Sequence, residues 1–144
     1  MVESNRDEAT GGCLCGAVRF EVSSRLRDVV NCHCGMCLKL YGTFGAHSKA
    51  KKSNIRITEA RGLKWYRTSK IARRGFYQEC GSSLFWQPDK QDATGILAGS
   101  LDQPTGINTM GHIFVGDKAD FYAIRDYLPQ FEKSSDGALP DDSL

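Results

Sequence analysis

Cys32-His33-Cys34-Gly35-Met36-Cys37 places three thiols within six residues, and this stretch decides the fold. Side chains of an extended segment alternate between its two faces, so Cys32 and Cys34 point to one side and His33 points away. The Cys-x-x-Cys spacing that follows is a turn spacing, which folds Cys37 back toward the other two sulfurs. Three converging thiolates favour zinc, whose catalytic sites keep three protein ligands and leave a fourth position to water or substrate. A closed structural site with a fourth ligand from elsewhere, or buried free cysteines, are the alternatives.

The remaining cysteines, Cys13, Cys15 and Cys80, form a second candidate metal site. Cys80-Gly81 after a polar turn is typical of zinc ribbons, where glycine permits the turn and backbone N–H groups reach the sulfur. A structural metal held by these three residues would tie the first strand to the middle of the chain. A closed site needs four ligands, and Tyr77 occupies the position at which a Cys-x-x-Cys knuckle would begin.

Length and composition favour one ordinary globular domain. The chain has 144 residues, of which 40% are hydrophobic and 25% charged, enough for a working core. Its formal net charge of +2 is too small to favour nucleic acid or an anionic membrane, and no apolar run is long enough to span a bilayer. Residues 1–8 are largely polar and predict no signal peptide, which places the protein in the cytoplasm. In that reducing compartment, clustered cysteines hold metal more often than they form disulfides.

Short runs of alternating apolar and polar residues, separated by glycine-containing turns, predict a mainly β fold of antiparallel sheets with little helix. We expect one domain over residues 11–131, with a disordered lead over 1–10 and a disordered tail over 132–144. Helical turns are expected at residues 38–41 and 119–122. The expected strands cover residues 17–22, 29–32, 43–48, 55–58, 63–67, 71–77, 83–86, 93–98 and 112–115.

Six short segments, taken in order, carry a resemblance to a known family. They are Gly12-Cys13-Leu14-Cys15-Gly16, Cys32-His33-Cys34-x-x-Cys37, Phe76-x-x-x-Cys80-Gly81-Ser82, Gly99-Ser100-Leu101-Asp102, His112-Ile113-Phe114 and Leu128-Pro129-x-Phe131. Together they span residues 11–131 and resemble the glutathione-dependent formaldehyde-activating enzyme family, which includes centromere protein V. The resemblance implies a zinc-binding fold of the β-tent kind with two metal sites. By position, the structural zinc would be held by Cys13, Cys15 and Cys80, and the catalytic zinc by Cys32, Cys34 and Cys37.

The family pattern has a cysteine where this chain has Tyr77, and a neutral tyrosine is a poor zinc ligand. Three outcomes stay open for the structural site: completion by water or another side chain, a weakened site, or an empty one. His47 or His112 could donate a nitrogen to it, and an ordinary structural role is the alternative for both.

The resemblance also implies a zinc-dependent carbon–sulfur lyase that acts on the adduct of a thiol with a small aldehyde. Glutathione, the expected small-molecule partner, would bind the zinc through its sulfur and add to formaldehyde, giving S-hydroxymethylglutathione. A zinc complex with three thiolates carries a net charge of −1, which favours thiolate exchange over peptide hydrolysis. The carboxylates of glutathione would need cationic partners. The candidates are Arg67, Lys70, Arg73 and Arg74, whereas Lys49, Lys51 and Lys52 are expected on a solvated turn.

Two other functions fit the same cysteines. A non-catalytic zinc-stabilised binding module would use the metal only for folding, but the acidic C-terminus does not suit chromatin binding. A thiol-based redox sensor would oxidise the central cysteines reversibly. An exchangeable fourth ligand on the central metal separates the enzyme from the binding module. The sequence leaves the substrate and the oligomeric state open.

Overall fold

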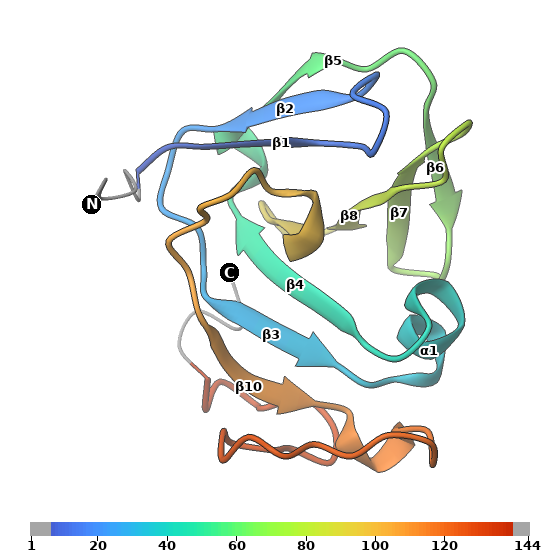
Figure 1. Ribbon diagram of the computed structural model, residues 1–144, viewed down its shortest axis with the longest axis vertical. Coiled ribbons are helices and arrows are strands. Elements are labelled where there is room, and N and C mark those ends of the chain that lie inside the picture. The colour runs from blue at the N-terminus through green and yellow to red at the C-terminus, as the bar shows by residue number, and fades with distance from the viewer. Residues whose placement is uncertain (1–6, 140–144) are drawn as a thin grey trace.

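Two β-sheets form the body of the protein in a computed structural model that describes residues 7–139 (Figure 1). One sheet has three strands in the order β1-β2-β5, and the other has seven in the order β10-β3-β4-β9-β8-β7-β6. The strands are β1 (Ala9–Gly12), β2 (Arg19–Val22), β3 (Val29–Cys32), β4 (Gly45–Ala50), β5 (Ile55–Glu59), β6 (Leu63–Arg67), β7 (Ala72–Tyr77), β8 (Ser83–Pro88), β9 (Thr94–Leu97) and β10 (Thr109–Ile113). The helices are α1 (Gly35–Tyr41) and the 3-10 turns η1 (Lys52–Asn54), η2 (Ala98–Ser100) and η3 (Val115–Asp117). The predicted mainly β fold with little helix is confirmed.

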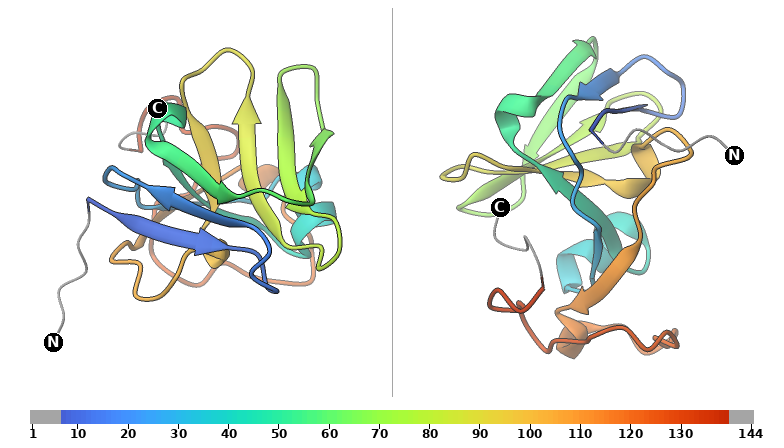
Figure 2. Two further views of the ribbon diagram at one scale, coloured as in Figure 1. Left: turned by 90° about the horizontal axis from the view of Figure 1, so that it is seen from above. Right: turned by 90° about the vertical axis from the view of Figure 1, so that its left-hand side faces the viewer.

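The core lies where the small sheet covers the large one. Figure 1 shows the three-stranded sheet across the top, while the seven-stranded sheet curves from β10 round to β6, and Figure 2 shows the two sheets from above and from the side. Phe20 of β2 meets Phe85 of β8 edge to face, with ring centroids 5.0 Å apart. Leu84 and Ile96 of the large sheet are fully buried beside them. Burial of these side chains holds the two sheets together.

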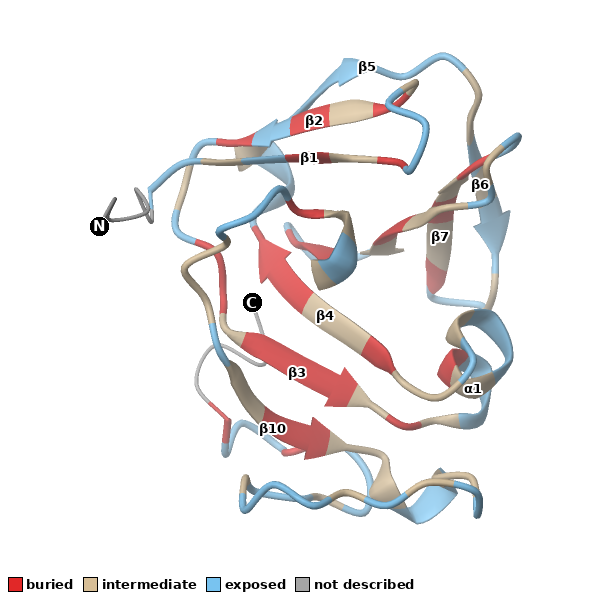
Figure 3. Cartoon of the chain, in the orientation of Figure 1, coloured by how far each residue is buried: buried red, intermediate tan, exposed pale blue. Residues whose placement is uncertain are grey.

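One pair of strands departs from the predicted antiparallel arrangement. β10 pairs with β3 in parallel, with Ile113 opposite Cys32 and His112 opposite Asn31. On its other side β3 pairs with β4, with Gly45 opposite Cys32. β3 is therefore buried along most of its length (Figure 3). The strand that carries the first central cysteine is thus fixed on both edges.

The ordered chain extends beyond both predicted boundaries. β1 begins at Ala9, inside the lead predicted for residues 1–10. Residues 132–139, predicted as part of a disordered tail, pack on the body instead, and the Leu139 side chain is only 4% exposed. Leu139 fits against Gly111, where a Cβ would lie 2.9 Å from the leucine Cδ2. This end is held by the Leu139 side chain and by two backbone hydrogen bonds, from the Phe114 N–H to the Lys133 carbonyl oxygen at 2.9 Å and from the Gly116 N–H to the Glu132 carbonyl oxygen at 3.2 Å. Residues 1–6 and 140–144 lie outside the described part.

The short helices also differ in detail from the prediction. The turn expected at residues 38–41 is part of a longer helix, α1, which Gly42 ends at a φ of 95°. The helical turn expected at residues 119–122 is instead a non-helical turn at residues 120–121. The 3-10 turn η3 forms just before it, after Phe114 adopts a left-handed backbone at φ 55°. Within residues 7–139, no helix has the length and apolar character needed to cross a bilayer.

Gly11 provides a test of the packing around Phe20. A Cβ at this position would lie 2.4 Å from Cζ of Phe20 and 2.5 Å from the Ser100 carbonyl oxygen. We expect Gly11→Ala to lower the free energy of unfolding by about 1–3 kcal/mol, because the overpacked core must shift. Urea denaturation measures this change. Gly99→Ala, which adds a Cβ in open space, is the matched control and should stay within about 0.5 kcal/mol.

Candidate metal centres and binding cavity

The three central cysteines meet at the junction of β3 and α1. Their sulfurs, on Cys32, Cys34 and Cys37, all lie within 4.8 Å of one another. Cys32 ends β3, Cys34 is the N-cap of α1, and the Cys37 N–H donates to the Cys34 sulfur at 3.4 Å. Hydrogen bonds from Cys32 and Cys37 lower the pKa of Cys34 to about 2, and the same contact with Cys34 raises the pKa of Cys32 far above its ordinary value. The cluster therefore favours negative charge on Cys34 and suits a cation.

His33 lies between two of these cysteines but faces the opposite way, as strand alternation predicts. Its ring is 1% exposed, with Nδ1 2.7 Å from the Tyr122 hydroxyl and Nε2 2.9 Å from Nδ1 of His112. His112 continues the chain of contacts to the Asp126 carboxylate at 2.9 Å. Burial lowers the pKa of His33 to about 4, so its ring is neutral at pH 7. His112, considered above as a possible donor to the second site, is part of this buried network instead.

His47 lies beside the central cysteines rather than the second group. Its Nε2 is 3.8 Å from the Cys37 sulfur. Burial, reinforced by the positive charges of Arg74 and Arg27, lowers the pKa of His47 to about 3. A neutral imidazole is thus in place to contact the sulfur of Cys37. The sequence offered no signal for this contact beyond the histidine itself.

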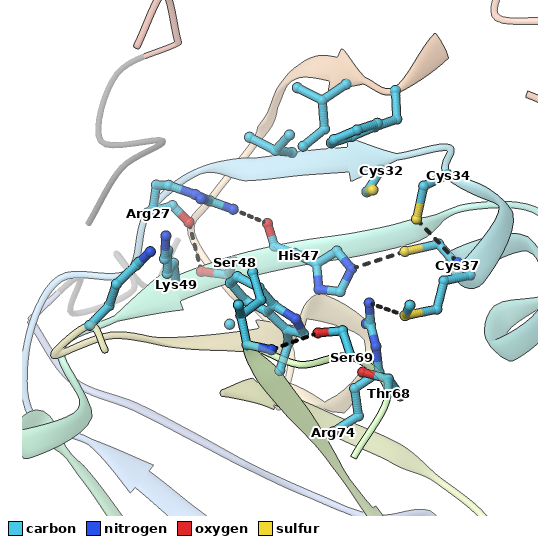
Figure 4. Close-up of a pocket in the computed structure, with 18 residues that line it drawn as sticks. Arg27, Cys32, Cys34, Cys37, His47, Ser48, Lys49, Thr68, Ser69 and Arg74 are labelled. Atoms are coloured by element: carbon cyan, nitrogen blue, oxygen red, sulfur yellow. Dashed lines mark hydrogen bonds between the residues drawn. The ribbon is translucent and has the colours of Figure 1, made fainter. Parts of the chain in front are cut away.

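A cavity of about 440 Å³ opens on the central cysteines. Figure 4 shows Cys32, Cys34 and Cys37 at one end, with Arg27 and Lys49 toward the other. The volume falls in the range of about 300–1,000 Å³ that is usual for small-molecule sites. Apolar side chains also line the cavity: Val30, Ile71, Trp86, Ile113 and Phe114. The cavity therefore joins a sulfur cluster to a cationic end in one space with a partly apolar lining.

The cations of this cavity are mostly not those expected from the sequence. Arg74 lines it, and its Nη1 donates to the Tyr41 hydroxyl at 2.8 Å. Arg73, the residue before Arg74 in β7, faces the other way and stacks 4.1 Å over the Trp65 ring. Arg67 pairs with a carboxylate outside the cavity at 2.8 Å, and Lys70 is not among the lining residues.

Lys49 also corrects an expectation, because it was placed on a solvated turn. It belongs to β4, is buried and lines the cavity together with Arg27. Its ammonium lies 5.9 Å from the centre of the Trp86 ring. Lys51, by contrast, is exposed just after the strand. The strand continues two residues further than predicted, and this length decides which lysine faces the cavity.

The second cysteine group joins the β1–β2 turn to the β7–β8 turn. The sulfurs of Cys13, Cys15 and Cys80 lie within 4.8 Å of one another, and those of Cys13 and Cys15 are 3.7 Å apart. The Val18 N–H donates to the Cys13 sulfur at 3.2 Å. Backbone donors of this kind stabilise thiolates, so this donor set also fits a thiophilic metal ion. Both cysteine triads can therefore hold a metal.

The comparisons with known proteins agree with this arrangement. The sequence profile of the glutathione-dependent formaldehyde-activating enzyme family matches residues 8–117, a range that contains all six cysteines. The fold is similar to the crystal structure of a Rhodobacter sphaeroides protein, with a TM-score of 0.57 and 26% sequence identity. That match covers 72% of this chain and 98% of the other. On the match to its profile, the chain belongs to the glutathione-dependent formaldehyde-activating enzyme family.

Proposed function

We propose that this protein is a cytoplasmic, zinc-dependent carbon–sulfur lyase that forms and cleaves the adduct of a thiol such as glutathione with a small aldehyde. The observation that carries the proposal is the cavity, which brings an open group of three sulfurs and buried cations into one space. Cys32, Cys34 and Cys37 would hold the zinc and leave a fourth position to the thiol. When bound there, zinc lowers the pKa of a coordinated thiol, so that its sulfur is nucleophilic at neutral pH.

The protein's own residues act on the aldehyde oxygen. When the sulfur bonds to the carbonyl carbon, the π electron pair of the C=O bond moves to oxygen. The oxygen then takes a proton from solvent, which replaces the proton that the thiol released to solvent, and becomes the hydroxyl of the adduct. Arg74 lines the cavity and is held in place by Tyr41. Its guanidinium stabilises the charge that develops on this oxygen. In the lyase direction, the same contact binds the hydroxyl oxygen as it loses its proton.

The other end of the cavity selects the thiol. Arg27 and Lys49 place positive charge there, with Trp86 beside the lysine. Carboxylates of a peptide thiol bind such cations through charge-assisted hydrogen bonds. The apolar side chains that line the cavity would pack against the thiol and exclude water from the reacting atoms.

Lys49→Met should therefore weaken binding of anionic thiols specifically. We expect the KM for glutathione to rise about 10- to 100-fold, as for loss of a charged hydrogen bond, with little change in kcat. The KM for glutathione diethyl ester, which lacks both carboxylates, should not change. Lys51→Met is the matched control, because Lys51 is exposed and outside the cavity. An equal rise in KM for both thiols would argue against carboxylate recognition by Lys49.

The activity itself is tested by NMR with ¹³C-labelled formaldehyde and glutathione. The zinc-loaded protein should accelerate both formation and breakdown of the S-hydroxymethyl adduct, and the rate should saturate with each substrate. Acetaldehyde and glyoxylate in place of formaldehyde define the aldehyde range. If metal is bound but no aldehyde reacts faster than without protein, the lyase proposal is wrong and a non-catalytic role is favoured.

A further inference from the structure

The second cysteine group has three sulfurs, which leaves the fourth coordination position of a tetrahedral metal site without a sulfur ligand. Within residues 7–139, no further cysteine, histidine or carboxylate joins Cys13, Cys15 and Cys80 at ligand distance. His47 and His112 lie at the central site and in the buried network described above. The group therefore offers a metal three thiolates and no fourth protein ligand of these types.

Tyr77 occupies the place from which a fourth ligand would come. Its N–H donates to the Ser82 carbonyl oxygen at 3.0 Å, and the Gly81 N–H donates to the Tyr77 carbonyl oxygen at 2.9 Å. This turn holds positions 77 and 80 on its two arms, which is the arrangement of a metal knuckle. The Tyr77 side chain makes other contacts: its hydroxyl donates to the Glu79 carboxylate at 2.9 Å, and its ring belongs to the core.

The fourth coordination position of this site is open to solvent. Cys15 is exposed, and the neighbouring Leu14 side chain is 86% exposed. Ser82 offers a hydroxyl beside this group, with Oγ 3.2 Å from the Cys80 sulfur, but this oxygen already accepts the Leu14 N–H at 2.8 Å. It holds the two turns together, and a neutral hydroxyl is a poor ligand beside three thiolates. A molecule from solution can reach the metal position past Leu14 and Cys15.

We propose that Cys13, Cys15 and Cys80 form an open metal site that takes a small thiol from solution as its fourth ligand. Cys13, Cys15 and Cys80 would hold the metal, and the thiol would release its proton to solvent and take the fourth position through its sulfur in place of water. A sulfur ligand is favoured over water because a metal that selects three thiolates is soft. The site is then a second thiol-binding centre, separate from the proposed lyase site, and it does not depend on lyase activity.

The test uses cobalt(II), whose sulfur-to-metal charge-transfer absorption reports the number of thiolates. Cys34→Ser disables the central triad, so that the second group is observed alone in the full chain. Titration with 2-mercaptoethanol should raise the absorption by roughly one third, as the thiolates increase from three to four, and the rise should saturate. An unchanged spectrum would mean that the site is closed by the protein, and absence of bound cobalt would mean that it holds no metal.

Position 77 is tested in the same background. Cys34→Ser/Tyr77→Cys should show the four-thiolate absorption without added thiol and should no longer respond to 2-mercaptoethanol. Cys34→Ser/Tyr77→Phe removes the hydroxyl, adds no ligand and should still respond. If the added cysteine leaves the thiol response intact in a folded protein, the thiol binds at a position that residue 77 does not reach, and the fourth position proposed here is wrong. Should the Tyr77→Cys chain not fold, the titration of Cys34→Ser/Tyr77→Phe with 2-mercaptoethanol shows whether the site binds a thiol.

Discussion

Replacing Cys34 with serine will remove one metal ion per chain and reduce adduct formation to the uncatalysed rate. Cys34 supplies one of the three sulfurs of the central triad, which all lie within 4.8 Å of one another. Without this thiolate the site has two sulfur ligands, which is too few for a stable zinc centre. Metal analysis of the purified protein should give about one ion in place of about two.

The Cys34→Ser substitution also distinguishes loss of the metal from misfolding of the chain. Cys34 is the N-cap of α1, and serine is among the best N-cap residues, so the helix should keep its start. Circular dichroism and the free energy of unfolding of the metal-free proteins should therefore be nearly unchanged. Cys13→Ser is the matched control, since it should lose the other metal and keep lyase activity in the fraction that folds. Full activity in Cys34→Ser would exclude the central triad from catalysis.

Arg74→Met is expected to lower kcat about 10²- to 10³-fold while leaving the metal content unchanged. The expected loss is that of a donor to a developing oxyanion. Methionine keeps much of the side-chain volume but removes the charge. Lysine at this position should restore part of the rate, because it supplies a point charge without the fork that reaches Tyr41. Steady-state kinetics with glutathione and formaldehyde, alongside metal analysis, measure the effect.

The neighbouring residue provides the control for Arg74. Arg73 lies on the same strand, stacks on Trp65 and hydrogen-bonds to Gln87 at 2.7 Å, outside the cavity. Arg73→Met removes the same charge from the opposite face of the sheet and should leave kcat within about twofold of the unmodified enzyme. Equal losses in the two variants would show that the overall charge of β7 matters, and not the guanidinium in the cavity.

The central triad was predictable from sequence because its geometry is local. Cys32, Cys34 and Cys37 are fixed by strand alternation and one helical turn, so spacing alone brings the sulfurs together. The mainly β fold followed from the same short-range patterns. These patterns involve neighbours in the chain and need no knowledge of tertiary contacts.

The cationic part of the cavity could not be predicted in the same way. Whether Arg73 or Arg74 faces the cavity depends on the register of β7 against β8, which includes a shift between Gly75 and Phe76. Lys49 was missed because β4 extends into a segment that resembles a polar turn. In both cases tertiary packing decides the direction of a charged side chain, and local composition does not.

Contacts between distant segments account for the rest. The parallel pairing of β3 with β10 and the contact between His33 and His112 join residues far apart in sequence. No periodicity within either segment indicates its partner. The unusual second site, in contrast, was indicated by one residue, Tyr77, although only the structure shows where its hydroxyl is directed.

The parallel pairing also sets an order of events during synthesis on the ribosome. Cys32 is flanked by Gly45 of β4 and Ile113 of β10, and the second of these emerges long after the first. At about 5–20 residues per second, the roughly 80 residues between Cys32 and Ile113 take on the order of 4–16 s to translate. During that interval the nascent chain presents its reduced central thiols with one edge of β3 uncovered. Metal supplied at this stage can be bound before the C-terminal segment closes behind the site.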